Sequence, residues 1–110
     1  MIATRQLKLK RDNDLVDVDI RIFAPEGSGR VWSCRYEIDW PEGRQVMDAG
    51  GIDAVQAILL AFQMIGADIY TSSYHKSGRL MFEAPGQGYG FPVPESIRHL
   101  LVGDDRIYGA

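Results

Sequence analysis

The stretch that decides the fold is "VWSCRYEIDWPEGR", Val31 to Arg44. Its larger apolar residues fall at every second position: Trp32, Cys34, Tyr36, Ile38 and Trp40. The intervening Ser33, Arg35, Glu37 and Asp39 are polar. Side chains alternate between the two faces of a strand, so the pattern predicts a strand with one buried face and one wet face. The proline and glycine of "WPEGR" then predict a tight turn.

Two upstream runs repeat the same alternation. Val16, Val18, Ile20 and Ile22 would share one face, with Asp17, Asp19 and Arg21 on the other. Before them, Leu7 and Leu9 alternate with Lys8 and Lys10. The turn-forming sequence "PEGSG", Pro25 to Gly29, joins the second run to the third. One dry face on successive strands is typical of an antiparallel sheet, so we predict an antiparallel meander of about four strands.

Charge suggests how the second and third runs pair. Setting residue 24 opposite residue 30 places Asp19 opposite Arg35, although Asp17 then faces Glu37. A slide of two residues would place Arg21 opposite Arg35 and Asp19 opposite Glu37. Directly opposed like charges are destabilising. We therefore expect the first register, in which the side chain of Cys34 points inward and is inert.

A long apolar helix is expected after this meander. Asp53 can cap it, with Gln56 three residues later as in a capping box. The apolar residues at helical spacing are Val55, Ile58, Leu59, Phe62, Ile65 and Ile69. The opposite face, Gln56, Leu60, Gln63 and Ala67, carries no charge, whereas a surface helix normally shows charge there. Either the C-terminal third of the chain or a second subunit should therefore cover it.

The C-terminal third predicts a further strand, "RLMFEA" (Arg79 to Ala84), and a short helix from Glu95 to about Leu101. Between them lies the glycine- and proline-rich "GQGYGFPVP". Its prolines lack the N–H groups that a phosphate loop uses, so we interpret it as a crossing in which Tyr89 and Phe91 fill the core. The tail "GDDRIYGA" is expected to be loosely held. The predicted fold is α+β, one domain over residues 1–110: a meander packed by one helix on one face, then a strand and a short helix.

Composition excludes several functions. The chain of 110 residues is 45% hydrophobic and 25% charged, with a net charge of −3, so it offers no basic field for nucleic acid. Its longest uncharged run, Ala54 to Ala67, has 14 residues, which is too short to span a membrane. The N-terminus has no apolar leader, so we expect a cytoplasmic protein. The single cysteine excludes an internal disulfide and a multi-thiolate metal site, and no cofactor is expected.

The stretch "YTSSYHKSGR", Tyr70 to Arg79, is the densest in reactive side chains. Lys76 and Arg79 could hold an anion, and a histidine such as His75 can titrate near neutral pH. Together with Tyr74 and with Tyr89 of the glycine-rich segment, they form a candidate ligand-binding site. The alternative is an ordinary polar loop, because surface polar residues need no functional explanation.

No catalytic template can be completed from the remaining residues. His99 is the other histidine of the chain, and two histidines without paired cysteines give no zinc spacing. The carboxylates Asp17, Asp19, Glu37 and Asp39 would share the open face of the sheet with arginines, as a solvated surface does. The sequence therefore indicates no catalytic residue and no metal ligand, and it favours a protein that is not an enzyme.

Several phrases resemble a group of short bacterial proteins known as a domain of unknown function. They are "WSCRYEIDWPEG", "GGIDAVQAILLAFQMIGADIY", "TSSYHKSGRLMFE" and "GQGYGFPVPESIRHLLVGDD". The resemblance extends from about Arg5 to Asp105. It implies a stand-alone bacterial cytoplasmic domain, and it brings no activity, cofactor or catalytic residue with it.

Two functional hypotheses follow. The first is an interaction or accessory protein, a homodimer or a partner-binding module, that works through the sheet edge or the uncharged helix face. The second is a domain, possibly enzymatic, that binds a small ligand or an anion between the Tyr74–Arg79 and Gly86–Phe91 segments. The first requires the Leu60, Gln63 and Ala67 face to be exposed in the monomer. The second requires a concave pocket between the two segments.

Overall fold

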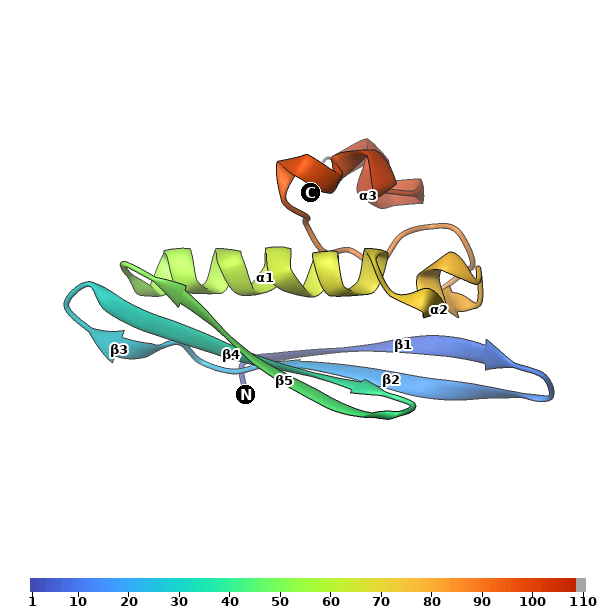
Figure 1. The fold of residues 1–110 in the computed structure, drawn as a ribbon, viewed down its shortest axis with the longest axis horizontal. Helices are drawn as coiled ribbons and strands as arrows, with labels where there is room; N and C mark the ends of the chain where they lie inside the picture. Colours follow the sequence, from blue (N-terminus) through green and yellow to red (C-terminus); the bar gives the residue numbers. More distant parts are fainter. Residues whose placement is uncertain (109–110) are drawn as a thin grey trace.

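The computed structural model describes residues 1–108 and confirms the α+β architecture. Its antiparallel sheet contains β1 (Ala3–Arg11), β2 (Asp14–Ile22), β3 (Glu26–Ser28), β4 (Val31–Trp40), β5 (Gly43–Gly51) and β6 (Leu80–Met81). Across the sheet the strands lie in the order β6, β1, β2, β4 and β5. The short β3 pairs with β4 on the same side as β2, further along that strand. One helix, α1 (Ala54–Tyr70), covers β4 and β5 on one face (Figure 1).

The buried side of the sheet is the one that the alternation predicts. Leu7, Val18, Ile20, Cys34 and Ile38 are fully buried in the core under α1. Burial raises the pKa of the Cys34 thiol, so this side chain is shielded and remains protonated at neutral pH. The predicted strands and the turn between β4 and β5 are therefore confirmed.

The predicted register between the second and third runs is wrong. Ile22 lies opposite Tyr36, and Ile20 opposite Ile38, a slide of four residues from the expected pairing with residues 32 and 34. Arg21 consequently stands opposite Glu37, and it donates to Glu37 at 3.0 Å and to Asp39 at 2.6 Å. One arginine thus neutralises two carboxylates, which is a better charge arrangement than either of the two registers considered from the sequence.

The capping prediction for α1 is confirmed. The backbone N–H of Gln56 donates to the Asp53 carboxylate at 2.8 Å, and the Gln56 side chain accepts from the N–H of Ile52 at 2.7 Å. The predicted apolar stripe is only partly right. Val55 and Leu59 are exposed, and the helix instead turns Ala57, Ala61, Ile65 and Ile69 towards the sheet and core. Small alanines allow the close approach that places the backbone of Gly51 against Ala57.

The C-terminal segment folds back over α1. After α2 (Ser73–Lys76) and β6, the chain continues to a 3₁₀ helix, η1 (Glu95–Leu100), and to α3 (Gly103–Tyr108), which lie above the C-terminal half of α1 (Figure 1). Tyr89 and Phe91 are buried, as the crossing predicts. Gly66 of α1 is where this segment crosses, because a Cβ there would lie 1.9 Å from the Pro92 carbonyl oxygen.

Two C-terminal predictions are corrected. The strand expected over Arg79–Ala84 is reduced to Leu80–Met81, which pairs with Lys8 and Leu9 of β1. The described part of the tail is not loose, because it forms α3 and the Asp105 side chain of this helix is buried. Residues 109 and 110 of that predicted tail lie outside the described part of the chain.

Candidate interaction surface

The strand β5 forms a free edge of the sheet. Within residues 1–108 it pairs with β4 alone, so the N–H and C=O groups along its other side have no strand partner. Natural sheets usually protect such an edge with lysine, proline or a bulge. The nine residues "GRQVMDAGG" contain neither lysine nor proline, and β5 pairs with β4 without a break from Gly43 to Gly51. Apart from the charges of Arg44 and Asp48 the edge has no such protection, and its length suits it to pairing with a strand that complements those charges.

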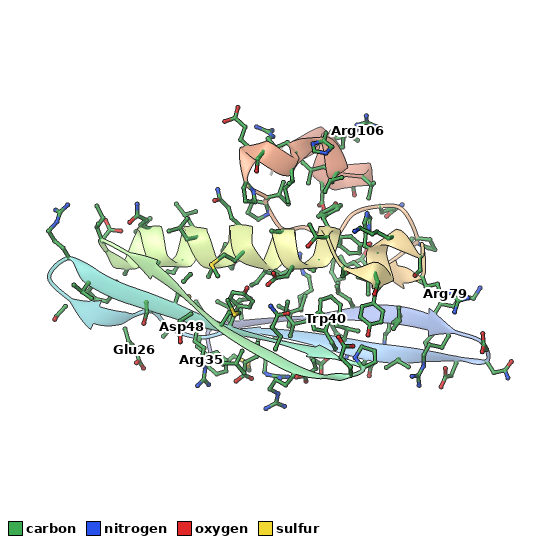
Figure 2. All side chains as sticks on the ribbon, in the orientation of Figure 1. Glu26, Arg35, Trp40, Asp48, Arg79 and Arg106 are labelled. Carbon is green, nitrogen blue, oxygen red and sulfur yellow. The ribbon has the colours of Figure 1, made fainter. Side chains whose placement is uncertain are left out.

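The two faces of β5 differ in character. Gln45 and Ala49 point towards α1: the Gln45 amide donates to Asp68 at 2.9 Å, and Ala49 is buried. Arg44 points to the outer face, where it donates to Asp39 at 2.9 Å. Alternation then places Val46 and Asp48 on the outer face with Arg44. Figure 2 shows Asp48 and its β4 partner Arg35 on that outer face, away from α1.

The uncharged side of α1 lies above this edge. Phe62 lies on the side of α1 that faces β1 and β2, because it lines a cavity of about 160 Å³ with Ala3, Arg5 and Ile22. Successive helical residues are rotated by about 100°, so Leu60 projects about 200° away from Phe62, towards β5. Leu60 is 36% exposed, and Met47 of β5 is 40% exposed. The free edge and the uncharged helix side therefore form one surface.

The C-terminal segment covers only half of α1. It packs against the helix at Gly66 and Tyr70, whereas Val55 and Leu59 in the N-terminal half are 65% and 55% exposed. The C-terminal segment thus covers the later turns of the helix, whereas among the described residues the side of the earlier turns that faces away from the sheet stays exposed.

The predicted ligand-binding residues separate into two groups. His75 and Tyr89 come together: His75 Nδ1 and the Tyr89 hydroxyl oxygen lie 2.5 Å apart, and both rings pack edge-on against Tyr70. Asp105 closes this cluster by accepting hydrogen bonds from the Tyr70 hydroxyl at 2.5 Å and from the N–H groups of Tyr89 and Gly90, each at 2.8 Å. The rings of His75, Tyr89 and Tyr70 fill the space between the Tyr74–Arg79 and Gly86–Phe91 segments. The pockets that the structure gives are each lined by residues of at most one of these two segments.

Burial shifts the titration of this cluster. It lowers the pKa of His75 below its ordinary value and raises the pKa of Tyr89 to about 12, so both side chains are neutral at pH 7. Burial and the Asp105 carboxylate raise the pKa of Tyr70 as well. Among the described residues, no buried side-chain nitrogen or oxygen lacks a hydrogen-bond partner. The cluster is a closed polar network that joins α3 to the core.

The other predicted residues lie at the surface. Tyr74 stacks on Trp40 with ring centroids 5.1 Å apart, and its hydroxyl donates to Glu42. Lys76 ends α2 and is exposed. Arg79 lies near the end of β1, where Figure 2 shows it at one end of the molecule.

Arg79 shares a pocket of about 460 Å³ with Lys10 and Arg11 of β1 and with Ser73 and Ser77. Within residues 1–108, Arg11 pairs with Asp14 at 3.7 Å, and the structure gives no ion pair for Lys10 or Arg79. This corner is a concentration of positive charge on an acidic protein. Its pocket is lined by two of the five predicted residues, Tyr74 and Arg79, and not by His75, Lys76 or Tyr89.

The carboxylates on the outer face are held by cations or an amide, and Glu37 is buried rather than solvated as expected. Lys8 pairs with Asp17, the Gln6 amide donates to Asp19 at 2.8 Å, and arginines hold the Glu37 and Asp39 side chains. The hydrogen bond from Arg21 keeps the pKa of Asp39 below its usual range. Within the described residues, no group of three or more His, Cys, Asp or Glu side chains is placed to hold a metal ion.

Sequence reasoning missed the residues on the β5 edge. A signal was present, since Arg44 and Asp48 flank Val46 symmetrically in "RQVMD". Asp105 was missed as well, and nothing in the surrounding sequence distinguishes it from Asp104.

The model of a family described as a domain of unknown function (DUF6968) matches residues 3–93. The chain belongs to this family. No curated protein and no solved structure matches it. No helix within residues 1–108 has both the length and the apolar character needed to cross a bilayer.

Proposed function

We propose that this DUF6968 protein is a non-enzymatic interaction module that acts as a homodimer. The observation that supports the proposal is the β5 edge together with the uncharged side of α1 above it, where Met47 and Leu60 are both exposed. Strand pairing along β5 would satisfy its free backbone groups, and burial of the apolar side chains would add a hydrophobic contribution.

Light scattering coupled to size-exclusion chromatography tests this proposal. The wild-type chain should give the mass of a dimer over a wide range of concentrations. Leu60→Glu should give monomers, because it places a charge at the centre of the proposed interface. Leu59→Glu is the matched control: it makes the same change one residue away, on the side of the helix that does not face β5, and it should remain dimeric. A wild-type monomer at every concentration, or two variants that both remain dimeric, would contradict the proposal.

A second candidate function is anion binding at the basic corner formed by Lys10, Arg11 and Arg79. It is favoured by Lys10 and Arg79, which have no ion pair with any residue of 1–108, and by the serine hydroxyls of the same pocket. A phosphate titration followed by NMR should shift the amide signals of Lys10 and Arg79 saturably, and Arg79→Gln should weaken this response. Arg106→Gln, on α3 and outside the pocket, is the control. Uniform small shifts that persist in Arg79→Gln would exclude the site.

A further inference from the structure

We infer that the homodimer forms by antiparallel pairing of the two β5 strands about a two-fold axis that passes through Val46. This inference rests on the proposed function and specifies its geometry: the partner is a second copy of the chain, and a single register joins the two sheets into one. The charges of β5 and of its neighbour β4 determine the register.

A two-fold axis perpendicular to the sheet sets residues of the same face opposite one another. An axis at Arg44 or at Asp48 would oppose that residue to its own copy, and so would oppose like charges. An axis at Gln45 would set Arg44 opposite Val46, and an axis at Met47 would set Asp48 opposite Val46. With the axis at Val46, Arg44 of each copy faces Asp48 of the other. Of these five registers, this one alone pairs opposite charges, and it does so twice.

The same register extends the charge pattern that already exists within one copy. In the structure Arg35 of β4 lies opposite Asp48, and Asp39 lies opposite Arg44. Pairing about Val46 would create two rows of charged side chains across the four strands. Each row contains Arg35 and Asp48 of one copy, followed by Arg44 and Asp39 of the other. The signs alternate along the whole row. Opposite charges on adjacent strands stabilise a sheet, and alternation excludes the shifted registers.

The side chains are available for these pairs. The Asp48 carboxylate makes no ion pair with any residue in the described part of the chain. Arg44 uses its Nε to donate to Asp39, and its Nη1 lies 4.0 Å from Glu37. Its guanidinium has further N–H donors that can reach a carboxylate on the other side. Val46 is 49% exposed between them, so the two valines would contact each other at the axis.

The helices are positioned to complete the interface on the other face. Strands are about 4.8 Å apart, and α1 lies over both β4 and β5, so pairing would bring the two helices to about 10 Å from each other. Helices in direct contact are about 8–10 Å apart. The uncharged sides of the two helices would therefore pack against each other, with Leu60 and Met47 at the contact.

Charge reversal tests the register. Arg44→Asp alone makes both cross-pairs acidic, and Asp48→Arg alone makes both basic, so each variant should dimerise about tenfold more weakly than the wild type. Mixed together, the two variants should form a heterodimer in which every cross-pair is again of opposite sign. Circular dichroism and thermal melting of each variant establish that it is folded. Variants that dimerise as tightly as the wild type, or a mixture without heterodimer, would overturn the register.

Cross-linking gives a second, independent measurement. Residues opposite one another in an antiparallel pair have Cα atoms about 4.5–5.5 Å apart, which a disulfide can span. Val46→Cys should therefore form a covalent dimer under mild oxidation. Gly50→Cys, on the same face and strand, lies four residues from the axis and should not, and the native Cys34 is buried. If the wild type is a dimer but neither charge reversal nor cross-linking gives the expected result, the register is wrong and the proposed function stands. If the wild type is a monomer, the register and the proposed function are both wrong.

Discussion

Asp105 is the residue that fastens the C-terminal segment to the rest of the fold. Its carboxylate is 4% exposed and accepts three hydrogen bonds, one from a tyrosine hydroxyl and two from backbone N–H groups. Asp105→Asn would turn an amide N–H towards donors and leave buried groups unpaired. We expect the free energy of unfolding to fall by about 2–3 kcal/mol, measured by urea denaturation.

The adjacent Asp104→Asn is the matched control for this prediction. Asp104 is exposed on the same helix, so its substitution should leave the urea midpoint almost unchanged. Equal effects of the two substitutions would show that burial of Asp105 contributes nothing to stability.

His75 should make the protein less stable in mild acid. Its pKa is lowered in the folded state because the ring is buried, so the unfolded chain binds a proton more readily than the folded one. Stability attributable to neutral His75 is complete above about pH 6.5, the ordinary value for histidine, and is lost as the pH falls below it. The decrease in urea midpoint between pH 7.5 and 5.5 should therefore be smaller in His75→Gln than in the wild type.

Carboxylates also affect stability in acid, and this comparison separates their contribution from that of His75. The exposed His99→Gln provides the control and should retain the wild-type pH dependence. If His75→Gln loses stability on acidification as steeply as the wild type, the histidine is not the cause.

At the scale of elements, Gly66 permits the crossing of α1 by the Pro92 segment. Alanine normally stabilises a helix by about 1 kcal/mol relative to glycine. In Gly66→Ala, however, the new Cβ would meet the Pro92 carbonyl, so we expect a net loss of about 1–3 kcal/mol in the free energy of unfolding. Gln63→Ala, one turn earlier and partly exposed, also favours the helix and should not destabilise the protein. A stabilised Gly66→Ala would mean that the segment does not press on the helix.

Strands, turns and the capped helix could be predicted because each depends on residues close together in the sequence. The alternation in Val31–Trp40 and the Asp53–Gln56 pair are patterns of this kind. The register between β2 and β4 was predicted wrongly because charge was compared for two registers only. The observed register, in which Arg21 contacts both Glu37 and Asp39, lies four residues away and was not one of them.

The candidate site was predictable only in part, for a related reason. The uncharged helix face was visible as a pattern, but its position above β5 depends on how α1 sits on the sheet. Likewise, His75 and Tyr89 were rightly associated, yet their burial by Tyr70 and Asp105 depends on a segment about 30 residues further along the chain from His75.

The proposed dimer requires the β5 edge of the molecule to be paired in solution rather than free. Hydrogen–deuterium exchange of the wild-type chain, measured by mass spectrometry at low and high protein concentration, tests this most directly. The amides of β5 that point away from β4 should become more protected at high concentration, and this protection should be absent in Leu60→Glu. The amides of β1, away from the proposed interface, serve as the internal reference. Exchange in Gly43–Gly51 that is rapid at every concentration, or that is the same in the wild type and in Leu60→Glu, would contradict a dimer formed through this edge.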